Sequence, residues 1–151
     1  MSRILQILFV FMFLFTVPAF AKPTPETLNG IETVSAQTVK SWLDDGKDMV
    51  ILDPRKRTQF MELHLPEAIS CPVNLDEGLG PKVIAKAVKK LEACKDITSL
   101  PKTALIVPYC NSVNCFMSPK AALALVKMGY TNVKWMREGI NGWKSNGFPL
   151  E

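Results

Sequence analysis

Cys110 is the residue of this chain whose surroundings most favour chemistry. It follows an apolar run at 104–107 whose β-branched residues predict a buried strand. Ser118 and Pro119 predict the start of a helix running to Gly129, because Ser caps free amides and Pro there gives up a donor that would be unpaired. The loop after Cys110 therefore lies before a helix N-terminus, where the positive end of the helix dipole stabilises a thiolate or binds an anion.

The rest of the chain alternates between strand and helix patterns. Strands are expected at 31–34, 49–52, 68–73, 104–107 and 132–136. Helices are expected after Ser35, over 56–63, from Lys82 to about Cys94, over 118–129 and within 139–143. The strand before Cys110 is expected to end at Val107, since Pro108 cannot donate to a ladder. This alternation predicts an α/β fold with a parallel sheet covered by helices on both faces.

Length and charge restrict the class of protein. A chain of 151 residues that is 48% hydrophobic is expected to form one core and one domain. The formal net charge of +4 is spread along the chain, without the basic patches and interleaved aromatics of a nucleic-acid-binding protein. No nucleic-acid partner is therefore expected, and the lysines of the helix that begins at Lys82 are interpreted as a solvated face.

The N-terminal segment has the pattern of a signal peptide. An apolar run at 4–17 follows Arg3, and Ala19 and Ala21 fit the small-residue rule for cleavage after Ala21. The run is shorter than the roughly 20 residues of a membrane span, so no membrane association is expected after cleavage; an uncut signal anchor is the alternative. We expect export, to the periplasm if the source is bacterial and otherwise by secretion, where disulfides form. The expected organisation is a signal peptide at 1–21, an extended leader at 22–30 and one domain at 31–151.

Other side chains are expected to support the chemistry. Asp53 and Arg55 follow a strand, at the edge where open α/β sheets place their sites, and are expected to form a buried pair that positions the loop after Cys110. His64, the only histidine, is interpreted as a packing residue, because no recognisable acidic partner is adjacent. The three tryptophans are expected in the core or at an interface. One His and scattered Cys predict neither a metal site nor a cofactor.

Five segments together resemble the rhodanese-like domain family. They read VILDPR at 50–55, HLPEAI at 64–69, YC at 109–110, GYTNV at 129–133 and EGINGW at 138–143. Each is weak alone, but their order and separations match the family across nearly all of the mature chain. The resemblance implies a rhodanese-like three-layer sandwich with a central parallel five-stranded sheet. It also implies a sulfurtransferase of the thiosulfate:acceptor type, in which Cys110 carries a persulfide between a small anionic sulfur donor and a thiol acceptor.

The loop after Cys110 departs from the family's usual form. It consists of Asn111, Ser112, Val113, Asn114, Cys115, Phe116, Met117 and Ser118. Met117 stands where the family usually carries Arg, so a phosphatase, which needs that Arg for phosphate, is not expected. The Cys-x4-Cys spacing with an aromatic after the second cysteine resembles a subgroup of the family. Glu138 replaces a family Gly, and the turn there is expected to differ.

Two alternatives to the sulfurtransferase follow from these departures. Cys110 and Cys115 are close enough in sequence for a reversible disulfide, as in a thiol–disulfide redox protein. The missing Arg instead favours a catalytically silent binding module of the same fold. Cys71 and Cys94 either pair or stay free. The sequence does not decide the pairing, because four cysteines allow three connectivities.

Overall fold

Five parallel strands form the centre of the molecule. The structure, a computed structural model, describes residues 22–73 and 75–151, so the predicted signal peptide lies outside the described residues. The strands are β1 (Glu32–Thr33), β2 (Val50–Asp53), β3 (Ile69–Ser70), β4 (Leu105–Pro108) and β5 (Asn132–Trp135). They pair in the order β1-β5-β4-β2-β3, and every pairing is parallel. The predicted five-stranded parallel sheet is confirmed.

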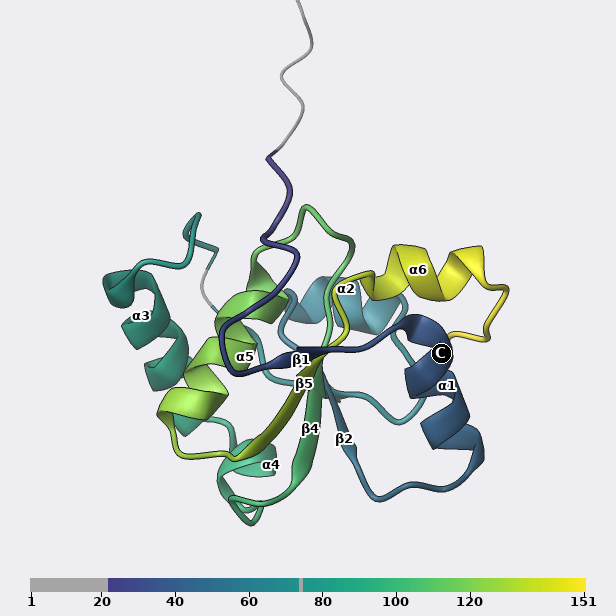
Figure 1. The fold of residues 1–151 in the computed structure, drawn as a ribbon, viewed down its shortest axis with the longest axis horizontal. Helices are drawn as coiled ribbons and strands as arrows, with labels where there is room; N and C mark the ends of the chain where they lie inside the picture. Colours follow the sequence, from purple (N-terminus) through teal and green to yellow (C-terminus); the bar gives the residue numbers. More distant parts are fainter. Residues whose placement is uncertain (1–21, 74) are drawn as a thin grey trace, which may run out of the picture.

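Helices cover both faces of this sheet (Figure 1). The helices are α1 (Ala36–Asp44), α2 (Arg57–Glu62), α3 (Pro81–Glu92), α4 (Lys95–Thr98), α5 (Met117–Lys127) and α6 (Gly139–Ser145). Because side chains alternate along a strand, Leu105 and Val107 of β4 pack with α1 and α6, whereas Ile106 packs with α3 and α5. The result is the three-layer α/β sandwich that the resemblance implies.

Local sequence signals account for the helix ends and faces. Ser35 caps α1 as expected, since its Oγ accepts a hydrogen bond from the Thr38 N–H at 3.1 Å. Helix α3 packs against α5 and buries Ile84 and Leu91, and its lysines are exposed. Helix α4 was not expected, because a single turn that buries only Ile97 has no helical period to detect. Among the described residues, no helix combines the length and apolar character needed to cross a membrane.

Strand β4 continues one residue beyond the predicted end. Pro108 pairs with Leu52 of β2, and the following Tyr109 N–H donates to the Leu52 carbonyl at 3.0 Å. The Pro108 carbonyl accepts a hydrogen bond from the Met136 N–H at 3.2 Å. A proline removes one donor but keeps its acceptor, so the strand tolerates it here. The expectation that this strand ends at Val107 is wrong.

Helix α5 also begins differently from the prediction. Its first residue is Met117, and the preceding Phe116 makes no side-chain cap. Pro119 is therefore the third residue of the helix, still within the first turn, where its missing N–H has no intrahelical acceptor to lose. Ser118 lies inside the helix and does not cap it, so its predicted capping role is wrong.

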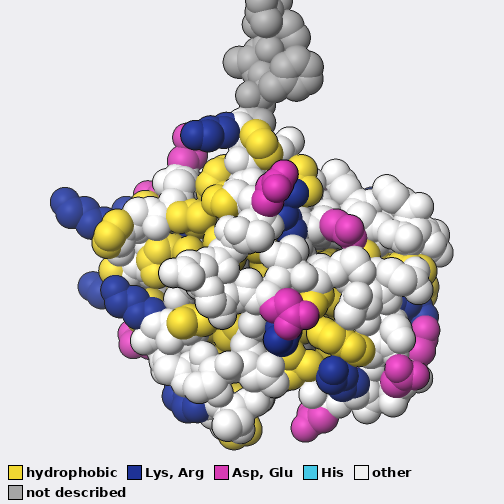
Figure 2. Space-filling view, in the orientation of Figure 1, with side chains coloured by type: hydrophobic (Ala, Val, Ile, Leu, Met, Phe, Trp, Pro, Cys, Tyr) yellow, Lys and Arg dark blue, Asp and Glu magenta, His cyan; other side chains and the backbone are white. Residues whose placement is uncertain are grey.

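Charged side chains are dispersed over the surface. On the face drawn in Figure 2, Lys and Arg side chains are scattered and alternate with acidic ones. Two surface ion pairs of this kind are Lys40 with Asp44 at 2.5 Å and Lys86 with Asp76 at 3.1 Å. This distribution agrees with the dispersed charge of the sequence.

Candidate active site

Cys110 lies at the C-terminal edge of the sheet, at its centre. It comes two residues after the end of β4, which is the middle strand, and it is fully buried. The chain then forms a loop, residues 111–116, that leads into α5 and stands above the ends of the strands (Figure 1). As the sequence predicts, Cys110 lies after a strand and in front of the N-terminus of a helix.

The Ser118 hydroxyl contacts the Cys110 sulfur. Its Oγ lies 3.2 Å from the Cys110 Sγ and accepts a hydrogen bond from the Trp135 indole N–H at 2.9 Å. Because the Cys110 sulfur is in a disulfide and carries no proton, the Ser118 hydroxyl is the donor of this contact. Ser118 and Trp135 are both buried, so this arrangement is shielded from water.

The structure pairs all four cysteines. Cys110 is bonded to Cys115 in the same loop, with 6.3 Å between the Cα atoms. Cys71, just after β3, is bonded to Cys94, just after α3, with 6.0 Å between the Cα atoms. The pairing that the sequence left open is thus one disulfide within the loop and one between two elements of the scaffold.

Asp53 and Arg55 form the expected ion pair. The Arg55 Nη2 lies 2.7 Å from the Asp53 Oδ2, and both side chains are buried. The guanidinium also donates to the Asn111 Oδ1 at 3.0 Å and to the Leu63 carbonyl at 2.7 Å. Burial disfavours the charged guanidinium, but hydrogen bonds and the charge of Asp53 outweigh it and raise the Arg55 pKa. The pair therefore holds the first residue of the loop.

Tyr109 contributes a buried hydroxyl that the sequence analysis missed. Its OH donates to the Asp53 Oδ2 at 2.5 Å and accepts from the Leu65 N–H at 3.2 Å. Burial raises the pKa of Tyr109 well above its ordinary value, and the negative charge of Asp53 raises it further. The sequence feature that could have identified Tyr109 as a site residue is its position next to Cys110.

The N-terminus of α6 holds the loop from a second side. The Ile140 N–H donates to the Cys110 carbonyl at 2.8 Å, and the Asn141 N–H donates to the Asn111 carbonyl at 2.9 Å. Gly139 has a φ of +63°, and a Cβ there would lie 2.3 Å from the Cys110 carbonyl oxygen. Glu138, which replaces a family Gly, accepts a hydrogen bond from the Ala36 N–H at 2.9 Å and so joins this turn to α1.

The leader segment holds the loop from a third side. The backbone N–H and the Oγ1 of Thr24 donate to the Val113 carbonyl at 2.8 and 2.6 Å. Arg137 in turn donates to the carbonyls of Thr24 and Pro25, each at 2.9 Å. Figure 1 shows this purple segment descending beside the green loop. The segment at 22–30, predicted only as an extended leader, thus contacts the candidate site.

His64 lies apart from these contacts. Its ring stacks on Phe60 at 3.9 Å between centroids, and its Nδ1 lies 3.0 Å from the Phe60 carbonyl. Its backbone exchanges two hydrogen bonds with Glu151. These contacts join the C-terminus to α2, and none of them involves Cys110.

Several backbone N–H groups of the loop and of the start of α5 are available as hydrogen-bond donors. In the described ranges 22–73 and 75–151, no acceptor contacts the N–H groups of residues 111–113 and 116–118. Hollows border the loop at three places: one of about 290 Å³ beside Cys115, one of about 450 Å³ beside Ser112 and Asn114, and one of about 580 Å³ beside Phe116. Donors of this kind, next to a helix N-terminus, suit a small anion.

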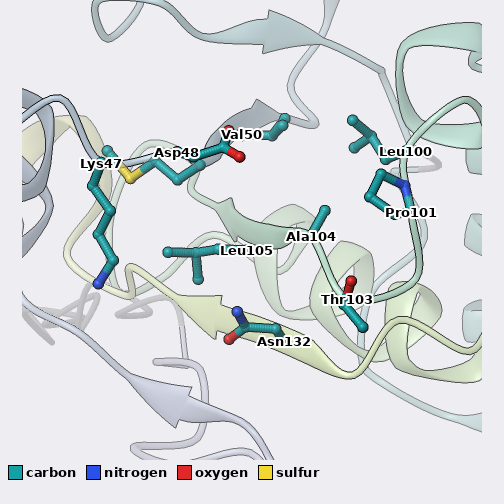
Figure 3. Close-up of a pocket in the computed structure, with 10 residues that line it drawn as sticks. Lys47, Asp48, Val50, Leu100, Pro101, Thr103, Ala104, Leu105 and Asn132 are labelled. Carbon is teal, nitrogen blue, oxygen red and sulfur yellow. The ribbon is translucent and has the colours of Figure 1, made fainter.

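A further hollow lies at the opposite edge of the sheet. Figure 3 shows this space of about 310 Å³, where β2, β4 and β5 begin. Its lining includes Lys47, Asp48 and Asn132 and none of the four cysteines. It is therefore separate from the candidate site around Cys110.

Comparison with known proteins identifies the family. The model of the rhodanese-like domain matches residues 35–146. The chain belongs to the rhodanese-like domain family. The matched range contains Cys110, its loop and the Asp53–Arg55 pair.

Two curated relatives and two solved structures illustrate the range of this rhodanese-like family. The mitochondrial protein HIGH ARSENIC CONTENT 1 of Arabidopsis thaliana is 28% identical over 128 residues, which cover 82% of this chain and 68% of that protein. A sulfurtransferase of Allochromatium vinosum is 22% identical over 80% of this chain and 94% of its own. A Bacillus halodurans protein aligns with a TM-score of 0.62 at 24% identity, covering 82% of this chain and 77% of that one. An Anabaena rhodanese-like domain aligns with a TM-score of 0.60 at 25% identity, covering 79% and 77%. The chain is thus a rhodanese-like domain with a sulfurtransferase relative at low identity.

Proposed function

We propose that this rhodanese-like domain is a sulfurtransferase that carries a sulfane sulfur as a persulfide on Cys110. The observation that carries the proposal is the setting of the Cys110 sulfur, which is buried, 3.2 Å from the Ser118 hydroxyl and in front of α5. A thiolate is stabilised by such a donor and by the helix dipole. Rhodanese-like sulfurtransferase domains use sulfur donors and acceptors, and the family match supports the same chemistry here.

The transfer begins from the reduced loop. The Cys110 thiolate attacks the outer sulfur of a donor such as thiosulfate, the bond between the two donor sulfurs breaks, and sulfite leaves with the electron pair. The unused N–H groups of residues 111–113 and 116–118 are donors for the anion, because Met117 supplies no charge. Arg55 is already engaged by Asp53 and Asn111, and its part is to position the loop.

Stoichiometric release of sulfite tests this proposal. The protein is reduced, freed of reductant and mixed with thiosulfate, and we expect one sulfite per chain. Cys110→Ser should release none, and the double variant Cys71→Ser/Cys94→Ser, which keeps the loop cysteines, should match the wild type. Absence of sulfite from the reduced wild type, or equal release from Cys110→Ser, would contradict the proposal.

We also propose that the protein is exported and that cleavage follows Ala21. The apolar run at 4–17 and the small residues before Lys22 support this proposal. Two disulfides suit an oxidising compartment. Expression of the full chain in a secreting host should yield a protein whose N-terminal residue, read by Edman sequencing, is Lys22. An N-terminus that retains residues 1–21 would contradict cleavage.

A further inference from the structure

We propose that Cys115 is a second catalytic residue, a resolving thiol that releases the outer sulfur of the Cys110 persulfide as hydrosulfide. The inference rests on the proposed sulfurtransferase function and deepens it. It assigns the site a chemical product, sulfide, and a second thiol that the family match alone does not assign.

The loop brings the two sulfurs into bonding contact. Cys115 is five residues from Cys110, and the structure contains the disulfide between them together with the complete sheet and helices. The Cys115 N–H donates to the Ser112 carbonyl at 3.0 Å, which closes the turn that returns Cys115 toward Cys110. Attack of Cys115 on Cys110 therefore requires no rearrangement of the sheet or helices.

The two cysteines differ in their accessibility to an external thiol. Cys110 is 0% exposed, whereas Cys115 is half-buried and lines the hollow of about 290 Å³. In the oxidised loop, an external thiol therefore reaches the Cys115 sulfur more readily than the Cys110 sulfur. Cys115 is the thiol that the structure shows bonded to the Cys110 sulfur, which is the inner sulfur of the persulfide.

The proposed step balances. The Cys115 thiolate attacks the Cys110 Sγ, the Sγ–Sγ bond forms, and the bond from Cys110 to the outer sulfur breaks. The outer sulfur leaves with the electron pair as hydrosulfide. It is reduced from the sulfane to the sulfide state, and the two cysteines are oxidised by two electrons to the disulfide. The Cys115 proton is released to solvent before the attack.

An external dithiol returns the site to its reduced form. Its thiolate attacks the Cys115 sulfur, which is the more accessible of the two, and displaces the Cys110 thiolate. The second thiol of the dithiol then frees Cys115 as its own disulfide forms. The Ser118 hydroxyl and the start of α5 stabilise the departing Cys110 thiolate. The overall reaction converts thiosulfate and a dithiol to sulfite, sulfide and the oxidised dithiol.

A single-turnover experiment tests the resolving step. Reduced protein is freed of reductant and mixed with thiosulfate, and sulfite, sulfide and intact mass are measured in the same sample. All variants are made in the Cys71→Ser/Cys94→Ser background, so that only the loop cysteines remain. The protein with the wild-type loop should release equal amounts of sulfite and sulfide. Its final mass should be that of the Cys110–Cys115 disulfide.

Cys115→Ser separates this inference from the proposed function. It should release one sulfite per chain, at least tenfold less sulfide than the wild-type loop in the same time, and retain one additional sulfur. Thr131→Ser, an exposed position away from the loop, is the control and should behave as the wild-type loop. Equal sulfide release from Cys115→Ser, or a wild-type loop that keeps the persulfide, would overturn the inference and leave the sulfurtransferase intact. Absence of sulfite in every protein would contradict both.

Discussion

At the scale of single residues, the Ser118 hydroxyl is the donor that contacts the Cys110 sulfur. Ser118 is held by the Trp135 indole, which leaves its proton for the Cys110 sulfur. A hydrogen bond to a charged group contributes about 1.5–3 kcal/mol. On the proposed function this bond contributes to stabilising the Cys110 thiolate, and Ser118 contacts the sulfur in place of capping the helix.

Ser118→Ala should raise the pKa of the Cys110 thiol in the reduced protein. Loss of about 1.4 kcal/mol corresponds to one pKa unit, so the pH profile of Cys110 alkylation should move upward by about one unit or more. Below that pKa, sulfite release should slow by about tenfold. The control is Ser112→Ala, which removes a hydroxyl that accepts from the Asn114 N–H at 3.3 Å and does not contact the Cys110 sulfur within the described part of the chain. Identical alkylation profiles for Ser118→Ala and the wild type would refute this role.

The buried Tyr109 predicts a pH dependence of stability. Burial and the charge of Asp53 raise its folded-state pKa above the ordinary value of about 10, so folding favours the protonated phenol. The stability that this contributes is complete below about pH 10 and is lost as the pH rises beyond it. In a Tyr130→Phe variant, absorbance at 295 nm should show phenolate only when the protein unfolds. Ionisation of the folded variant near pH 10 would contradict the buried contact.

At the scale of elements, the loop is a surface segment held by three separate parts of the scaffold. Arg55 holds the Asn111 side chain, the start of α6 holds two loop carbonyls, and Thr24 of the leader holds Val113. Each contact fixes one part of a loop that has no regular secondary structure. The geometry around Cys110 is thus set by elements from both ends of the chain.

Gly139→Ala tests the closest of these contacts. Its Cβ would lie 2.3 Å from the Cys110 carbonyl oxygen, so α6 or the loop must shift. Gly147→Ala is the matched control, because Gly147 also has a positive φ, +71°, but nothing lies within 4 Å of a Cβ there. The control should lose about 1–2 kcal/mol of unfolding free energy from the left-handed backbone alone. Gly139→Ala should lose more in denaturant melts and release sulfite more slowly; equal losses would contradict the close approach.

Local patterns predicted most elements, and the errors have physical causes. The alternation of strands and helices, the Ser35 cap and the Asp53–Arg55 pair depend on neighbours in sequence, which a pattern reports directly. The bond from Thr24 to Val113 joins residues 89 positions apart, and no local period encodes it. The end of β4 was predicted one residue too early, because the prediction considered only the missing N–H of Pro108. The Pro108 carbonyl still accepts a hydrogen bond from the Met136 N–H.

At the scale of the whole molecule, the two disulfides have different tasks. The bond from Cys71 to Cys94 closes a separation of 23 residues, and that from Cys110 to Cys115 a separation of 5. In the chain-entropy model these correspond to about 3 and about 2 kcal/mol of stability. The longer link joins elements of the scaffold, and the shorter one lies in the loop for which the chemistry is proposed.

Removing the scaffold disulfide should lower stability and leave the chemistry unchanged. Cys71→Ser/Cys94→Ser should lose about 3 kcal/mol of unfolding free energy relative to the oxidised wild type, measured by denaturant melts. At 25 °C the reduced double variant should still release one sulfite per chain. The opposite pattern, an unchanged stability with lost sulfite release, would place this disulfide in the active site.

Intact mass after thiosulfate treatment is the most direct test of the central claim that Cys110 takes up a sulfane sulfur. The Cys115→Ser variant is used, because it is expected to retain the persulfide, and it is reduced and freed of reductant before thiosulfate is added. We predict a gain of one sulfur atom that is absent when Cys110 is also replaced by Ser. An unchanged mass in the reduced variant, or the same gain without Cys110, would contradict the account.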